Sequence, residues 1–152
     1  LYTRSQIERR YATVLHHLEP TGRFVIDVLL TDPVSIARDP ARPYLGAHVS
    51  HPRDGVKYRY SEYFSYDPMT QIETTILDFE HPTKRSASFC TPLAQRQFFP
   101  AELEALLHYN GFDVVSHSGD FVGEAITSAT ESQVIVAKLA RPTRARARRS
   151  ST

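Results

Sequence analysis

Residues 96–138, RQFFPAELEALLHYNGFDVVSHSGDFVGEAITSATESQVIVAK, decide the fold of this chain. Pro100 is a favoured first residue of a helix, and three leucines between 103 and 107 form its buried side. Asn110-Gly111 ends the helix, because glycine accepts the left-handed backbone conformation that follows many helices. β-Branched and aromatic residues then predict strands at 112–116 and 133–137. The segment is therefore interpreted as helix, strand, polar connection and strand.

A similar pattern precedes this segment near the start of the chain. Ser5-Gln6-Ile7-Glu8 has the form of a capping box, and apolar residues from 7 to 18 recur at helical spacing. Glu19-Pro20-Thr21-Gly22 stops this helix. Residues 24–30 are apolar on both faces apart from Asp27, which is typical of a strand inside a covered parallel sheet.

Residues 31–97 have a different character. The stretch 31–56 contains four prolines and predicts an irregular excursion, with a short helical turn near 34–38. Aromatic and β-branched runs on either side of Asp67-Pro68-Met69-Thr70 predict an antiparallel hairpin over 56–79. A third strand is expected within 86–98, interrupted at Pro92.

The totals fit one ordinary domain: 152 residues, of which 41% are hydrophobic and 23% charged. No apolar run approaches the ~20 residues of a membrane span, and the first residues do not resemble a signal peptide. The single cysteine, Cys90, excludes an internal disulfide and fits a reducing compartment, so we expect a cytoplasmic location.

The Arg-rich tail, residues 141–152, carries five arginines and no acid. Such a composition favours a solvated, disordered terminus. Contact with nucleic acid, an anionic surface or an acidic partner is the weaker alternative, since no aromatic residues alternate with the arginines as stacking platforms.

Five segments in order resemble class I S-adenosylmethionine-dependent methyltransferases, in particular small bacterial enzymes with a β-stranded insertion. LEPTGRFVIDV (18–28) is similar to the family's L-x-P-G-G-x-strand pattern, with Thr21 in place of the first glycine. RQFFPAEL (96–103) resembles its R-x-F-x-P-x-E-L helix start, and NGFDV (110–114) resembles its A-G-F-x-V. YDPMTQ (66–71) and GDF (119–121) resemble two of its turns.

The resemblance implies an α/β fold, the C-terminal half of a Rossmann-like methyltransferase sheet. It would comprise the last three strands, the final one antiparallel, over residues 1–140, with an antiparallel β insertion at 31–97. It also implies S-adenosylmethionine as cofactor. The glycine-rich turn that would bind this cofactor is missing, because none of the six glycines (22, 46, 55, 111, 119, 123) has the required spacing. Cofactor-binding residues are therefore unassigned, and we expect no activity from this chain alone.

The implied function is the substrate side of an enzyme that transfers a methyl group to N or O of a small molecule. The alternative is a non-catalytic interaction subunit or pseudo-enzyme fragment. An unpaired sheet edge would then bind a partner chain or a second copy.

Five residues are candidates for substrate binding, and no catalytic residue is assigned. Tyr58, Tyr60 and Glu62 alternate onto one face of the predicted hairpin. Glu62 is interpreted either as a carboxylate for an amino-bearing substrate or base, or as the partner of a basic cross-strand neighbour. Arg96 is interpreted as a partner of a substrate carboxylate or of Glu62, or as a structural ion pair. Tyr2 either lines the methyl-transfer pocket or is simply an aromatic residue at a helix start.

No metal site is predicted. The histidines and Cys90 lack the spacing of metal ligands, so zinc is not expected.

Overall fold

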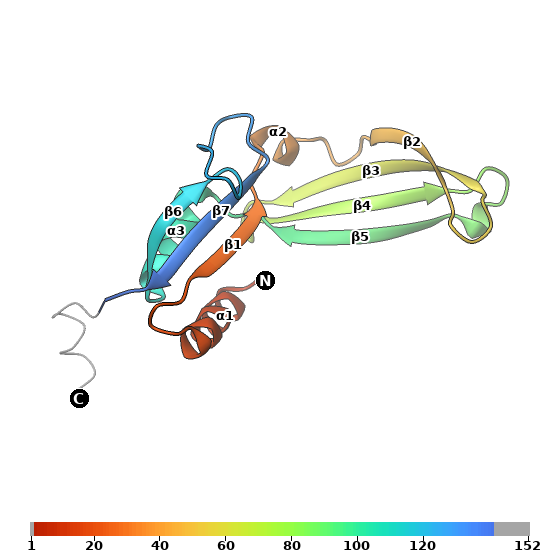
Figure 1. Ribbon diagram of the computed structural model, residues 1–152. Helices are drawn as coiled ribbons and strands as arrows, with labels where there is room; N and C mark the ends of the chain where they lie inside the picture. Colours follow the sequence, from red (N-terminus) through yellow and green to blue (C-terminus); the bar gives the residue numbers. More distant parts are fainter. Residues whose placement is uncertain (1, 142–152) are drawn as a thin grey trace. The chain divides into compact units, whose positions relative to one another are not determined.

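The computed structural model describes residues 2–141, which form two compact units (Figure 1). We call Tyr2 with Thr31–Gln97 the β unit, and Thr3–Leu30 with residues 98–141 the α/β unit. The predictions for the Arg-rich tail concern residues outside the described part, apart from Arg141. The elements are α1 (Arg4–His17), β1 (Phe24–Leu29), α2 (Pro33–Ile36), β2 (Tyr44–Ser50), β3 (Lys57–Asp67), β4 (Ile72–Glu80), the 3-10 turn η1 (Arg85–Ala87), β5 (Phe89–Arg96), α3 (Pro100–Tyr109), β6 (Phe112–Ser118) and β7 (Ser132–Leu139).

The α/β unit contains a three-stranded sheet in the order β1-β7-β6. β7 lies between the other two strands and is antiparallel to both, as Figure 1 shows. β1 and β6 therefore run in the same direction. The chain is a mixed α/β protein, as predicted, and its last strand is the antiparallel one.

The core of this unit lies on one face of the sheet, under α1 and α3. Its buried members are Ile7, Tyr11, Leu103, Leu107, Phe112, Ile135 and Ala137. Tyr11 meets the rings of Phe24 and Phe112 edge-on, at centroid distances of 6.2 and 5.9 Å. Leu103, Leu107 and Phe112 come from the segment that predicted a helix and a strand, and the partly buried Leu106 packs against them, so that segment supplies much of the core.

β1 departs from the prediction of a covered parallel strand. It pairs antiparallel with β7, and alternate residues point away from the core. Val25 and Leu29 on that outer face are 48% and 56% exposed, and Asp27 between them is also exposed. The apolar run is thus buried on one face only among the described residues.

The start of α1 differs from the predicted capping box. Thr3, rather than Ser5, is the N-cap: its hydroxyl accepts a hydrogen bond from the Gln6 amide at 3.3 Å. The Gln6 side chain in turn accepts from the Thr3 amide at 3.1 Å. Glu8 instead pairs with Arg4 one turn earlier, at 2.6 Å. Two overlapping sequences satisfied the same rule, and the earlier one forms the cap.

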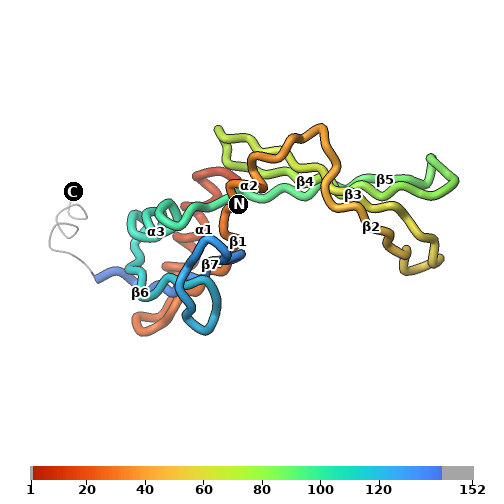
Figure 2. The backbone as a smooth tube through the Cα atoms, turned by 90° about the horizontal axis from the view of Figure 1, so that it is seen from above, coloured from red at the N-terminus to blue at the C-terminus, as the bar shows by residue number. Residues whose placement is uncertain are grey.

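The β unit is a four-stranded antiparallel sheet in the order β2-β3-β4-β5. β3 and β4 form a hairpin across residues 57–80. Figures 1 and 2 show the β2–β3 and β4–β5 connections at the same end of this sheet. The short helix α2 lies where a helical turn was expected. Its N-cap is Asp32, whose carboxylate accepts hydrogen bonds from the backbone amides of Val34 and Ser35.

Two expectations for the β unit were wrong. Residues 44–50 are a strand rather than irregular, and a bulge between Tyr44 and Ala47 breaks the alternation that would have revealed it. β5 also continues through Pro92 without interruption. It pairs only with β4, so a proline that lacks an N–H is tolerated on its free side.

No helix among residues 2–141 is both long enough and apolar enough to cross a membrane.

Candidate functional site

One face of the β-unit sheet carries most of its aromatic side chains, and we call it the aromatic face. The strand register places Tyr60 opposite Phe79, and Phe79 opposite Phe89. The ring centroids of these neighbours lie 4.9 and 4.8 Å apart. Strand alternation and register put these residues on the aromatic face: Tyr44, Tyr58, Tyr60, Glu62, Phe64, Glu73, Phe79 and Phe89. Three of the five predicted site residues therefore share one face.

Tyr60 and Glu62 form a hydrogen-bonded pair on the aromatic face. The Tyr60 hydroxyl donates to Glu62 Oε1. The pKa of Tyr60 is raised to about 12, mainly by burial and then by the hydrogen bond to Glu62 and the charge of Glu62. The cross-strand neighbours of Glu62 are Tyr44 and Leu77, so the predicted basic neighbour is absent. Glu62 is a carboxylate bound to a neutral phenol among aromatic rings.

An alkaline titration should report this pair. In the folded protein two phenols, Tyr11 and Tyr60, should ionise near pH 12 rather than near 10.0. Tyr60→Phe should remove one of them from the phenolate absorbance curve. Glu62→Gln should lower the pKa of Tyr60 only in part, because burial is the largest cause. Since the folded pKa is raised, the contribution of Tyr60 to stability is complete below pH 10.0 and is lost as pH rises towards 12. If the absorbance change near pH 12 in Tyr60→Phe still corresponds to two phenols rather than to Tyr11 alone, this assignment is wrong.

Arg38, just after α2, lies against the same face. Its guanidinium carbon is 4.2 Å from the ring centroid of Phe64 and 5.1 Å from that of Tyr44. The hydroxyl of Tyr44 accepts from the backbone amide of Asp39 at 2.9 Å, which holds the segment after α2 in place. The cation–π contacts fix a positive charge two positions along β3 from Glu62. Sequence reasoning missed Arg38, because it lies in the stretch that was expected to be irregular.

Glu73, at the start of β4, is a second missed residue. It is only 5% exposed. One carboxylate oxygen accepts from the Ser35 hydroxyl at 3.1 Å. The other accepts from the side-chain amides of Gln97 at 2.5 Å and Gln95 at 3.4 Å. Neutral donors alone hold this carboxylate among the described residues, and they connect α2 to β4 and β5.

Tyr2 and Arg96 lie away from the Tyr60–Glu62 pair. Tyr2 is 44% exposed, and its hydroxyl donates to the carbonyl oxygen of Ala94 at 2.9 Å. Arg96 donates to Gln71 Oε1 at 2.7 Å and to the Tyr2 carbonyl at 3.5 Å. Alternation along β5 places Arg96 on the face opposite Glu62, so these two residues do not pair.

Tyr58 is on the aromatic face but has a packing role. It is 7% exposed, and its ring meets those of His81 at 5.2 Å and Phe89 at 5.8 Å. The five predicted residues thus divide into a hydrogen-bonded pair, a packed ring, and two residues on another part of the β unit.

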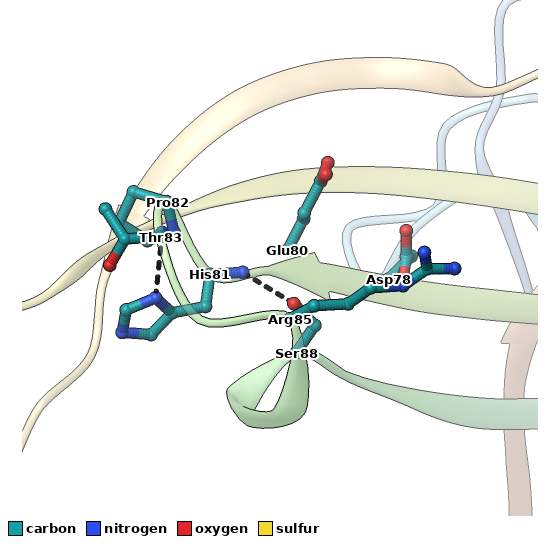
Figure 3. A pocket seen from close by; sticks show the side chains of 7 residues that line it. All are labelled: Asp78, Glu80, His81, Pro82, Thr83, Arg85 and Ser88. Carbon is teal, nitrogen blue, oxygen red and sulfur yellow. Dashed lines mark hydrogen bonds between the residues drawn. The ribbon is translucent and has the colours of Figure 1, made fainter.

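Two hollows lie at the end of the sheet where β4 turns into β5. The larger, of about 480 Å³, is drawn in Figure 3; its lining residues are Asp78, Glu80, His81, Pro82, Thr83, Arg85 and Ser88. The neighbouring hollow, of about 290 Å³, shares Glu80, His81 and Pro82 with it. His81 Nδ1 accepts from the amides of Thr83 and Lys84, so this histidine shapes the turn.

The described residues contain neither a cluster of metal ligands nor a glycine-rich turn at the end of β1. No group of three or more His, Cys, Asp or Glu residues is placed to bind a metal. β1 leads through Thr31 and Asp32 into the four-residue helix α2 without a glycine. The glycine-rich turn that S-adenosylmethionine requires is therefore not provided by the part of the chain that the structure describes.

The fold has counterparts among solved structures. The CcbJ methyltransferase from Streptomyces caelestis matches 93% of this chain and 53% of its own, with a TM-score of 0.67 and 19% identity. This chain has a partial class I methyltransferase fold. An S-adenosylmethionine-dependent methyltransferase from Clostridium acetobutylicum matches with a TM-score of 0.58 and 15% identity, covering 88% of this chain and 51% of its own.

CalS10, an amino pentose methyltransferase from Micromonospora echinaspora whose structure contains bound S-adenosylmethionine, matches with a TM-score of 0.56 and 15% identity. It covers 91% of this chain and 52% of its own. The chain with the partial methyltransferase fold thus spans about half the length of the structures it matches. No family model matches the sequence, and no curated protein matches it either.

Proposed function

We propose that this chain is the substrate-side, C-terminal half of an S-adenosylmethionine-dependent methyltransferase that methylates N or O of a small molecule. The half-length structural match supports this proposal most strongly. The order β1-β7-β6, with the last strand antiparallel, agrees with the family resemblance of the sequence. A cytoplasmic location belongs to the same proposal and is supported by the single cysteine.

The side chains of the aromatic face define what this half contributes. The second oxygen of Glu62, Oε2, has no hydrogen-bond partner among the described residues. It can accept a hydrogen bond from an amine of the acceptor and receive the proton that the nitrogen loses on methylation. Tyr60 keeps the Glu62 carboxylate in place, and the neighbouring rings of Phe79 and Phe89 form an apolar surface beside it. The name of CalS10, an amino pentose methyltransferase, makes an amine the favoured acceptor group.

Titration calorimetry with S-adenosylmethionine tests whether this chain supplies the substrate side and a second polypeptide binds the cofactor. The 152-residue chain alone should give no binding heat, because its six glycines lack the spacing of the cofactor-binding turn. Adding a polypeptide with the glycine-rich half of the fold should restore binding and methyl transfer. Tight cofactor binding by this chain without a partner would show that our assignment of the cofactor site is wrong.

The second candidate function is a non-catalytic interaction subunit. The exposed outer face of β1, with Val25 and Leu29, favours it, because apolar strand surface attracts partners. Within residues 2–141, β1 pairs with one neighbouring strand, β7, and its other edge has no strand beside it. Size-exclusion chromatography with light scattering measures association directly. If the chain stays monomeric at high concentration and does not bind a polypeptide with the glycine-rich half of the fold, this role is wrong.

A further inference from the structure

We propose that Arg38 and Glu62 together select acceptors that carry both an amine and a carboxylate, as an amino acid does. This inference rests on the proposed function, since it assigns the acceptor class to the same aromatic face. Arg38 would bind the carboxylate, and Glu62 would bind the amine.

Arg38 has the properties of a carboxylate anchor. Its guanidinium carbon lies over the Phe64 ring, 4.2 Å from the centroid, and the guanidinium makes no hydrogen bond or ion pair within residues 2–141. The contacts with the rings of Phe64 and Tyr44 hold the charge in place without using a hydrogen bond to either ring, so the N–H donors of Arg38 stay available. A planar guanidinium with parallel N–H donors matches a carboxylate in two hydrogen bonds.

Glu62 provides the complementary charge at a suitable distance. Residues 62 and 64 lie on the same face of β3, and their backbone positions are roughly 7 Å apart along the strand, with Arg38 over the ring of Phe64. Tyr44 connects them, because it lies opposite Glu62 and its ring is 5.9 Å from that of Phe64. A zwitterion whose two charged groups sit on one carbon, with a hydrogen bond of about 2.9 Å at each end, spans such a gap.

The other carboxylate of this face does not compete for the amine. Glu73 is 5% exposed, and both of its oxygens already accept hydrogen bonds from Ser35, Gln95 and Gln97. Glu62 is half-buried and keeps one oxygen open. Among the described residues, Glu62 is therefore the accessible carboxylate of the aromatic face.

A matched set of three probes tests the selection: tyrosine, tyramine, which lacks the carboxylate, and 3-(4-hydroxyphenyl)propionate, which lacks the amine. Saturation-transfer NMR with the full 152-residue chain measures their relative dissociation constants. Tyrosine should bind ~10-fold more tightly than either probe that lacks one charge. Arg38→Gln should remove the preference over tyramine, and Glu62→Gln should remove the preference over the propionate.

Arg85→Gln is the matched control, because Arg85 lines the hollow at the other end of the sheet and should leave the ranking unchanged. Thermal unfolding shows that each variant is folded. Arg38→Lys keeps the positive charge but lacks the parallel N–H donors of the guanidinium, so it should keep part of the preference for tyrosine over tyramine. Equal binding of tyrosine and tyramine, or no binding of any probe, overturns the proposal. Methylation of tyramine and tyrosine at equal rates by a reconstituted enzyme would keep the proposed function and remove this selection. Tyrosine binding that depends on Arg38, with no methyl transfer by the reconstituted enzyme, would keep the selection and remove the proposed function.

Discussion

Replacing Phe112 with alanine should lower the free energy of unfolding of the α/β unit by about 3–5 kcal/mol. The Phe112 side chain is fully buried at 0% exposure. Its ring lies 5.9 Å from that of Tyr11 and 5.4 Å from that of Phe24, centroid to centroid. Truncation leaves a cavity where α1, β1 and β6 meet, and these rings cannot collapse into it without moving the helix. This loss is a large share of the stability of an ordinary domain.

Urea denaturation followed by circular dichroism at 222 nm measures this loss, because α1 and α3 both belong to this unit. Phe121→Ala is the matched control from the same segment of sequence. Phe121 is 74% exposed, and its truncation should change the free energy of unfolding by no more than about 0.5 kcal/mol. Similar losses in the two variants would contradict the placement of the core.

The elements at the end of the chain could be predicted because their signals are local. Pro100 stands at the first turn of α3, and Gly111 has a φ of 93° directly after that helix. The same holds for the hairpin of β3 and β4, where Asp67 accepts from the Met69 amide and the Thr70 hydroxyl. Each signal acts within a few residues, which is the range that a sequence pattern reports.

β2 could not be predicted in the same way. Leu45 has a φ of 50°, an unusual conformation for leucine, and the bulge beside it shifts the register. What makes the segment a strand is its pairing with β3, and the local pattern of Pro43, Leu45 and Gly46 argues against a strand. Tertiary pairing here overrides local propensity.

The candidate site was predicted only where it depends on strand alternation. Tyr60 and Glu62 share a face because side chains alternate with a period of two, and this was visible in the sequence. Arg38 and Glu73 depend on contacts between residues far apart: Ser35 meets Glu73 across 38 positions, and Gln97 meets it across 24. Glu73 also lies in an alternation with Thr75 that resembles a solvent-facing row, although both are buried.

Under the proposed function, Val25→Lys should strongly weaken assembly with the cofactor-side half while leaving this chain folded. Val25 is 48% exposed on the outer face of β1, so a lysine there should change the stability of the isolated chain by no more than about 0.5 kcal/mol. If the missing half covers this face, the same lysine becomes a buried, unpaired charge that costs several kcal/mol. Each 1.4 kcal/mol weakens association tenfold, so the dissociation constant should rise at least ~100-fold.

The measurement is a titration of the 152-residue chain with a separately produced polypeptide that contains the glycine-rich half of the fold, followed by methyl transfer to an amine. Thr21→Lys serves as the control, because Thr21 is exposed in the turn before β1 and lies outside the outer face of the strand. Both variants add one positive charge, so a general electrostatic effect would appear in both. Loss of assembly in Val25→Lys alone would identify the outer face of β1 as the surface that the cofactor-side half covers. Equal activity in the two variants would mean that this face stays in solvent in the working enzyme, and the proposed assembly would have to use another surface.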